Sequence, residues 1–252
     1  MEHGEYRRMY EAEDAYWWFV SRRRLARGLL AAADPPAGPI LDLGCGTGAV
    51  TRFLAESFPG REVVGTDFSP EALRFASGRG IPNLVLADAE ALPLVGEAFA
   101  AVVCLDLLEH VADDGAAARE AFRCLQPGGV FVVNVPAYRW LWGSHDVALM
   151  HHRRYSRHEV RELLEAAGFE VERLSHSVFL LFPFVLMQRV VSRLRRSKGA
   201  SLPRVTPLVN RALIRLLELE GTMIARGSLP WGSSLTAVAR RSAQSGTTKP
   251  HP

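Results

Sequence analysis

The sequence predicts an α/β fold in which helices cover both faces of a mostly parallel sheet. Between residues 40 and 136, short apolar runs alternate with amphipathic runs. This alternation is typical of a parallel sheet buried on both faces. The chain has 252 residues, of which 48% are hydrophobic, which is enough for one such domain with added segments. The three cysteines lie in apolar or motif contexts with no metal-ligand spacing, so we expect them to be reduced and buried.

The expected elements follow one another with few interruptions. Residues 1–33 are predicted to be helical, and the proline-rich stretch 35–39 ends this helix. Ser69 and Pro70 favour a helix start, because a capping side chain is followed by proline in the first turn. Ser156 and Glu159 form a capping-box pattern. We predict strands near 39–44, 62–67, 84–88, 101–106, 129–135, 169–174 and 234–240, and later helices near 48–57, 69–79, 114–125 and 156–167.

A glycine-rich turn follows the first predicted strand. Gly44, Gly46 and Gly48 occupy alternate positions and lead into a helix. Such a turn lets a ligand approach the backbone and presents the free N–H groups of the helix, as nucleotide-like cofactors require. The dinucleotide fingerprint has the spacing G-x-G-x-x-G. The spacing here is different, which disfavours an NAD dehydrogenase.

Acidic residues stand at the ends of the neighbouring strands. Asp42 precedes the glycine turn, where an acid suits a cationic ligand better than a pyrophosphate. Asp67 ends the second strand, where it can accept hydrogen bonds from a ribose diol, and Phe68 offers a ring face. Asp88 ends the third strand and can accept a bond from an exocyclic amine. Ribose, adenine and a positive centre together describe S-adenosylmethionine.

Five stretches then resemble, in order and spacing, the motifs of class I S-adenosylmethionine-dependent methyltransferases. They read DLGCGTG, GTDFSPEAL, ADAEALPL, AVVCLDLLEHV and LQPGGVFVVNVP, within residues 38–136. The closest resemblance is to the small-molecule group called type 11 or type 12. It implies a Rossmann-like, seven-stranded, mostly parallel sheet whose last strand is antiparallel. The cofactor residues expected on this domain are Asp42, Gly44, Cys45, Gly46, Gly48, Asp67, Phe68, Asp88, Ala89 and Leu105.

The segment before the sheet, residues 1–34, is predicted to be a helical lid. Similar Trp-Trp-Phe segments act as lids in related methyltransferases, which implies that Trp18 lies over the cofactor. Arg22 or Arg23 would then meet the methionine carboxylate. The alternative is a helix that packs its aromatic side chains on the sheet edge.

The stretch 137–157 is the expected acceptor loop, because it leaves the carboxyl end of the fifth strand. Five of the eight histidines lie between residues 145 and 176. A histidine with a pKa of about 6.5 can take the proton of an oxygen or nitrogen nucleophile, and arginines can bind an anionic group. Catalytic candidates are His145, Asp146, His151 and His152, and acceptor-binding candidates are Tyr138, Trp142, Arg153, Arg154, Tyr155 and His110.

Two other interpretations of this loop stay open. The loop could close on the domain through hydrogen bonds alone, and His110 could bond to the next helix. The spacing of histidine and aspartate fits no strong metal-ligand pattern, so no metal site is predicted.

Residues 178–231 form an expected helical insertion between the sixth and seventh strands of the methyltransferase domain, 35–241. The apolar run 179–187 is too short to span a bilayer, which takes about 20 residues. Basic residues follow at Arg189, Arg193, Arg195, Arg196 and Lys198, and apolar-then-basic order is typical of interfacial helices. The insertion could dock on a membrane through 178–198, cover a lipid-like acceptor, or form a helical hairpin or dimer contact. Residues 242–252 are expected to be disordered.

Charge is divided unevenly along the chain. Residues 1–136 hold 12 Lys and Arg against 19 Asp and Glu, whereas residues 137–252 hold 18 against 8. A basic half suggests a membrane surface, a phosphorylated substrate or nucleic acid as partner, or else a solvated basic face. The charged start of the chain lacks the pattern of a secretory signal, which favours a cytoplasmic location, with the inner membrane face as a peripheral alternative.

The predicted function is methyl transfer from S-adenosylmethionine to an oxygen, or a nitrogen, of a small or lipid-linked, anionic acceptor by a monomer or homodimer. One alternative is a non-catalytic, cofactor-binding partner subunit. Another is a nucleic-acid methyltransferase. Residues 106–109 read DLLE where an N-P-P-Y-like motif would support base methylation, which argues against that alternative.

Overall fold

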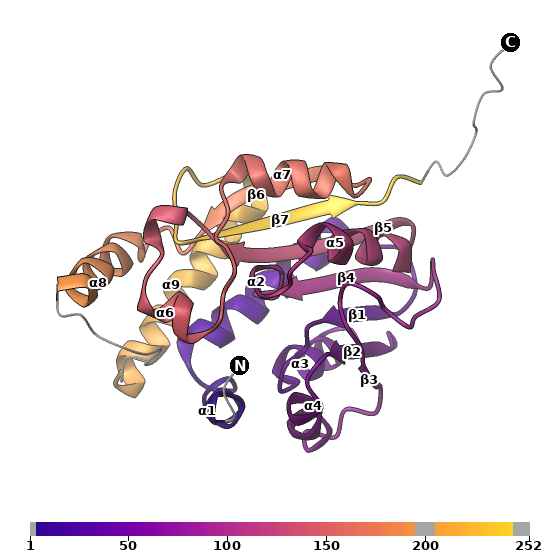
Figure 1. The fold of residues 1–252 in the computed structure, drawn as a ribbon, viewed down its shortest axis with the longest axis horizontal. Helices are drawn as coiled ribbons and strands as arrows, with labels where there is room; N and C mark the ends of the chain where they lie inside the picture. The colour runs from indigo at the N-terminus through magenta and orange to yellow at the C-terminus, as the bar shows by residue number, and fades with distance from the viewer. Residues whose placement is uncertain (1–3, 195–204, 244–252) are drawn as a thin grey trace, which may run out of the picture.

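A single mixed sheet of seven strands organises the protein (Figure 1). The structure is a computed structural model that describes residues 4–194 and 205–243. The strand order is β3-β2-β1-β4-β5-β7-β6; the first five strands pair in parallel, and β7 runs antiparallel to both neighbours. The strands are β1 Ile40–Leu43, β2 Val63–Asp67, β3 Leu84–Leu86, β4 Phe99–Leu105, β5 Leu125–Pro136, β6 Glu170–Ser177 and β7 Ser234–Arg240. This confirms the predicted Rossmann-like methyltransferase fold.

Helices cover both faces of the sheet. The helices are α1 Glu5–Ala12, α2 Trp17–Ala33, α3 Ala49–Ser57, α4 Pro70–Ser77, α5 Asp114–Cys124, α6 Ser144–Ala148, α7 Arg157–Ala166, α8 Phe182–Leu194 and α9 Pro207–Arg226. One apolar cluster joins the sheet to α5 and α7, and a second joins it to α2, α3 and α9. Neighbouring residues of β4 serve opposite clusters, since Val102 belongs to the first and Val103 to the second. This alternation is the period-two pattern of a strand buried on both faces.

The amino-terminal segment differs from the single helix predicted over 1–33. It forms two helices, because the chain leaves the helical conformation before α2, where Tyr16 is extended (φ −72°, ψ 130°). Glu13, between the helices, is buried and accepts a hydrogen bond from the Thr47 hydroxyl. The break therefore lets α1 turn away from α2 and pack over the glycine turn.

Two further segments are more ordered than the sequence suggested. Strand β6 extends to Ser177, beyond the predicted end at 174, because it pairs with β7 as far as Ser234. The loop 137–157 contains α6 and a short 3-10 helix, Arg139–Leu141, neither of which was predicted. Another 3-10 helix, Leu108–His110, follows β4.

The insertion places α9 against α2. The Trp17 backbone N–H donates to Asn210 (2.8 Å), and Arg24 pairs with Glu218. Buried Glu220 accepts hydrogen bonds from the backbone of Val178 (2.5 Å) and Leu180 (3.0 Å).

Within residues 4–194 and 205–243, no helix is both long enough and apolar enough to cross a bilayer. The Arg193 side chain, the basic residues at 195–198 and residues 244–252 of the stretch 242–252, which was predicted to be disordered, lie outside the described parts.

Candidate functional site

The three glycines of the turn after β1 adopt backbone conformations that other residues rarely reach. Gly44, Gly46 and Gly48 have φ of +76°, +55° and +87°. A Cβ on Gly44 would lie 2.8 Å from Leu107 Cδ1, and one on Gly46 would lie 2.9 Å from Met9 Cε. Glycine is therefore favoured at all three positions by backbone conformation, and at Gly44 the Leu107 side chain also leaves little space for a Cβ.

Asp67, at the end of β2, lies beside the glycine turn and binds its backbone. Its Oδ2 accepts the backbone N–H of Gly46 and its Oδ1 accepts that of Ser69, both at 2.9 Å. Burial raises the pKa of this carboxyl, and the N–H groups of Ser69 and Gly46 oppose the rise. Because each carboxylate oxygen has two lone pairs, the two oxygens keep the capacity to accept hydroxyl groups of a ribose.

Asp42 lies beneath the turn instead of facing a ligand. It is buried, and its Oδ2 accepts the Thr51 hydroxyl at 2.6 Å. Burial raises the pKa of Asp42 to about 7, although the Thr51 hydrogen bond opposes the rise. The expectation that Asp42 meets a cationic ligand is therefore replaced by a role in joining β1 to the first turns of α3.

The remaining expected cofactor residues lie along the same edge of the sheet. Phe68 is 65% exposed, which leaves its ring face available to a ligand. Asp88 is exposed and accepts the Glu90 backbone N–H at 3.0 Å, whereas Ala89 is buried. Cys45 is a buried free thiol in the turn, and Leu105 ends β4.

Helix α1 and the residues after it cover the glycine turn. Arg79, which follows α4, forms ion pairs of 2.7 Å with Glu13 and Asp14 and donates to the Thr47 carbonyl at 2.8 Å. Its guanidinium lies 4.2 Å from the centre of the Tyr10 ring. The predicted lid segment is thus tied to the cofactor turn, but through α1 and not through the tryptophans of α2.

Trp18 and Arg22 face a different set of partners. The Arg22 guanidinium lies 4.3 Å from the centre of the Trp18 ring, pairs with Asp106, and donates to the Ser234 hydroxyl at 3.0 Å. Asp106 also accepts from the Asn134 side chain at 3.0 Å. Arg22 therefore bridges α2 to the ends of β4 and β7. The alternative Arg23 donates to the backbone carbonyls of residues 13 and 14, and the Nε atoms of both Arg22 and Arg23 have no hydrogen-bond partner among the described residues.

Asp146 is the centre of the acceptor loop. Its Oδ1 accepts Arg154 Nε at 2.7 Å and lies 3.0 Å from His151 Nδ1, and its Oδ2 accepts the Gly143 N–H at 2.9 Å. Burial by itself raises the pKa of Asp146, but the His151 and Arg154 contacts outweigh burial and hold it well below its usual range. Asp146 is completely buried, so it orients His151 and does not meet an acceptor directly.

Arg153, Arg154 and Tyr155 of the loop form hydrogen bonds and ion pairs within the protein. Buried Arg154 donates to Asp146 and to the Ala137 carbonyl (2.9 Å). Arg153 pairs with Asp114 at 2.7 Å and donates to two backbone carbonyls. Buried Tyr155 also donates to Asp114 at 2.7 Å. The polar groups of these three residues, which were expected to bind the acceptor, have partners within the protein that hold the loop to α5 and to the end of β5.

The other candidates of the loop differ in environment. Burial and the nearby charge of Arg189 lower the pKa of His145 to about 4, which makes it a weak proton acceptor. His152 is exposed, and its backbone N–H donates to the Glu109 carbonyl at 2.7 Å. Tyr138 stacks on His176, with ring centres 5.2 Å apart, and lies beside Phe182 of the insertion. Trp142 is half-buried.

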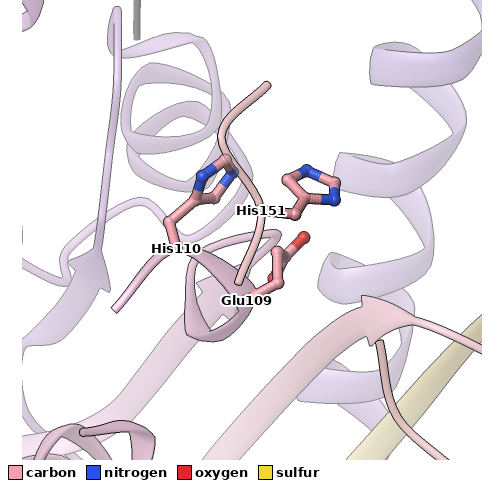
Figure 2. Close-up of side chains that lie close together, drawn as sticks. All are labelled: Glu109, His110 and His151. Carbon is pink, nitrogen blue, oxygen red and sulfur yellow. The ribbon is translucent and has the colours of Figure 1, made fainter. Parts of the chain in front are cut away.

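The structure brings His110 and His151 together, with Glu109 beside them (Figure 2). The two rings meet edge to face with centres 4.7 Å apart. Burial, and then the neighbouring His151, lower the pKa of His110 to about 4. Burial and the charge of Asp106 raise the pKa of Glu109 well above its ordinary value. Glu109 was not among the expected site residues; its place in the loop after β4, beside His110, was the available signal.

The residues of the turn and the strand ends fit S-adenosylmethionine. The glycine turn is formed by three residues with positive φ, Asp67 is fixed beside it, and Phe68 offers an exposed ring. The sheet order with an antiparallel β7 defines the class I methyltransferase fold. A solved methyltransferase in complex with the Trm112 activator of Haloferax volcanii shares this fold, with TM-score 0.61, 21% identity, and coverage of 96% of this chain and 95% of that one.

Sequence comparisons agree with the fold. A family model described as "Methyltransferase domain" matches residues 41–133. A "Probable S-adenosylmethionine-dependent methyltransferase" of Mycolicibacterium smegmatis is 33% identical over 168 residues, 64% of this chain and 62% of the relative, so the match spans less than two thirds of that protein. The malonyl-[acyl-carrier protein] O-methyltransferase of Methylococcus capsulatus is 30% identical over 234 residues, 86% of this chain and 82% of the relative. The chain belongs to the class I S-adenosylmethionine-dependent methyltransferases, whose methyl donor is S-adenosylmethionine.

Proposed function

We propose that this chain methylates an oxygen, or a nitrogen, of a small or lipid-linked acceptor. The observation that carries the proposal is the joining of Asp67 to the glycine turn through the Gly46 N–H. When bound, S-adenosylmethionine supplies a methyl group on a sulfonium centre for in-line displacement. The chain's own contribution is to hold donor and acceptor in line, which is a large part of the rate enhancement in such reactions.

Asp67, Phe68 and the three glycines are assigned to the cofactor. Asp67 would accept the ribose hydroxyls, and the exposed Phe68 ring would lie against the adenine. Asp88 would accept a hydrogen bond from the adenine amino group. Two contacts outside the cofactor surface would hold the site in place. Asp42 accepts the Thr51 hydroxyl, and Arg22 pairs with Asp106.

The acceptor is assigned to the edge of the sheet lined by the loop 137–157. His151 is the loop histidine best placed to act on the acceptor, because buried Asp146 orients its ring. The distance of 3.0 Å between Asp146 and His151 Nδ1 would leave Nε2 for the acceptor. An oxygen acceptor is favoured over nitrogen, since the Methylococcus capsulatus relative that covers 86% of this chain is named as an O-methyltransferase.

The insertion supports an apolar component in the acceptor or in its surroundings. Helix α8 exposes Phe184, Met187 and Val190, while Phe182 lies against Tyr138 of the acceptor loop. An apolar surface of this kind favours either a lipid-linked acceptor or peripheral contact with a membrane surface through 178–198. We place the protein on the cytoplasmic side, as a monomer or homodimer.

Calorimetric titration with S-adenosylmethionine and S-adenosylhomocysteine tests the cofactor assignment. We expect micromolar binding of both, and absence of binding would overturn the proposal. Release of S-adenosylhomocysteine is then measured with carboxylic, phenolic and prenyl-linked acceptors, with and without liposomes. Tight cofactor binding with no turnover on any acceptor would favour the non-catalytic partner subunit. Equal turnover on nucleic acid and on small molecules would contradict the acceptor class.

A further inference from the structure

Glu109, His110 and His151 form a cluster of potential metal ligands at the carboxyl edge of the sheet (Figure 2). One nitrogen of each ring and one carboxylate oxygen all lie within 4.8 Å of one another. Glu109 and His110 come from the 3-10 helix after β4, and His151 comes from the loop after α6. We propose that this cluster binds one divalent transition-metal ion.

The ligand types indicate the class of metal. Two imidazoles and one carboxylate form a set that zinc and iron(II) sites use, whereas magnesium and calcium prefer oxygen ligands. Zinc–nitrogen bonds of about 2.0 Å at tetrahedral angles place ligand atoms roughly 3.3 Å apart. The side chains would therefore draw together by about 1.5 Å at most, a change within reach of side-chain rotation. Three protein ligands leave coordination positions open for a small molecule.

The Glu109 side chain is an independent observation that favours a cation. Glu109 is 1% exposed, and its Oε2 has no hydrogen-bond partner among the described residues. A buried polar atom without a partner is costly, because it has lost its water without a replacement. A cation between Glu109 and the two imidazoles would satisfy this oxygen.

The surroundings of the cluster match those of known metal-binding imidazoles. A histidine that binds a metal usually has its other ring nitrogen bonded to a carboxylate or carbonyl, which fixes the orientation of the ring. Asp146 fills this role at His151 Nδ1, and Arg154 and the Gly143 N–H hold Asp146 in turn. The His152 N–H donates to the Glu109 carbonyl at 2.7 Å. The two segments that carry the ligands are thus tied together before any ion binds.

The sequence predicted no metal site, because the spacing of histidine and aspartate fits no strong metal-ligand pattern. Only the return of the acceptor loop toward the end of β4 brings the three together. An ion here would lie where the acceptor is proposed to bind, and His151 would then act on the acceptor through the ion. The metal site itself does not depend on the proposed function, since it rests on the cluster alone.

The proposal is tested on the untagged chain of residues 1–252 after chelator treatment and dialysis. Titration calorimetry with zinc chloride at pH 7.5 is expected to show one binding site per chain. Cobalt(II) is expected to give visible absorption bands of a low-coordinate site. Glu109→Gln, His110→Asn and His151→Asn are each expected to weaken zinc binding tenfold or more, and Asp146→Asn about tenfold.

His158→Ala is the matched control, because His158 is an exposed histidine that pairs with Glu162 on α7. Its zinc affinity and stoichiometry are expected to be unchanged. No zinc binding by the wild-type chain, or equal binding by all the ligand variants, would overturn the proposal. If a ligand variant fails to fold, zinc-edge X-ray absorption of the wild type decides, because two imidazole ligands support the site and a shell without them refutes it. Cofactor binding measured in the same samples reports on the proposed function separately.

Discussion

The backbone N–H of Gly46 donates a 2.9 Å hydrogen bond to Oδ2 of Asp67. This bond joins the middle of the glycine turn after β1 to the end of β2. The Ser69 N–H holds the other oxygen of the same carboxylate, so the carboxylate is fixed from two sides. A carboxylate fixed in this way loses little further freedom when a ribose binds to it, which is the basis of the first prediction.

Asp67→Ala is expected to weaken S-adenosylmethionine binding by about 10- to 100-fold, or ~1.4–2.7 kcal/mol, because two charge-assisted hydrogen bonds are lost. Titration calorimetry measures the change. Glu62→Ala is the control, since Glu62 is an exposed carboxylate before the opposite end of β2. If both variants bind the cofactor as the wild type does, Asp67 has no part in ribose recognition.

Gly48→Ala is expected to destabilise the fold more than Gly60→Ala. Both glycines have positive φ, +87° and +89°, so the backbone strain is similar. A Cβ on Gly48 would lie 2.6 Å from Ile81 Cδ1 and 3.0 Å from the Ala76 Cα, whereas a Cβ on Gly60 meets nothing within 4 Å. We expect Gly60→Ala to cost about 1 kcal/mol and Gly48→Ala about 1–3 kcal/mol more in free energy of unfolding by urea titration. Equal losses would contradict the steric account.

Asp146→Asn is expected to lower the free energy of unfolding by about 3 kcal/mol at pH 7, because it removes the charge that Arg154 and His151 meet in the interior. The folded-state pKa of Asp146 is lowered, so its stabilisation is present above the unfolded pKa and is lost as pH falls. The difference between wild type and variant should therefore shrink below about pH 4, where the unfolded carboxyl protonates. Urea titrations at several pH values measure it, and a difference that grows on acidification would contradict the prediction.

For Asp42→Asn, the stability of the wild type relative to the variant is expected to fall as pH rises, which is the opposite of the dependence expected for Asp146→Asn. The pKa of folded Asp42 is raised to about 7, so its ionisation costs stability as pH rises from the unfolded value of about 4 towards 7. Relative to Asp42→Asn, the wild type should lose up to a few kcal/mol between pH 4 and pH 8. Thr51 can donate to an asparagine oxygen as it does to the carboxylate, so the variant keeps this hydrogen bond and differs from the wild type mainly in charge. A pH-independent difference would show that Asp42 is not strained by its charge.

His151→Ala is expected to reduce turnover by about 100-fold or more once an acceptor is known, with cofactor affinity unchanged. His145→Ala should have a smaller effect, because the lowered pKa of His145, about 4, makes it a weak proton acceptor. Steady-state kinetics measure the effect of each variant on turnover, and cofactor titration measures its effect on cofactor affinity. Unchanged turnover in both variants would remove the loop histidines from the chemistry.

The local motifs were predictable because their physics is local. The glycine turn, the acids at the strand ends and the period-two apolar runs each depend on neighbouring residues, and the sheet followed from their order. Helix α4 begins where Ser69 and Pro70 predicted, with the Ser69 hydroxyl accepting the Ala72 N–H. The insertion before β7 also followed from the distance between two strand patterns.

The roles of charged side chains were not predictable in the same way. Arg154 was expected to bind an acceptor and is instead buried against Asp146, while Asp42 faces Thr51 below the turn. A sequence shows that a charge is present but not which way its side chain points, and a buried charge takes whichever partner the packing supplies.

The sequence by itself therefore determined the fold class and the cofactor, because these depend on short-range patterns. Only the tertiary structure decided that α1 covers the turn, that Asp146 orients His151, and that Glu109 and His110 meet His151. Those contacts join segments that are distant in the chain, and their geometry is set by the packing of whole elements and not by any local preference.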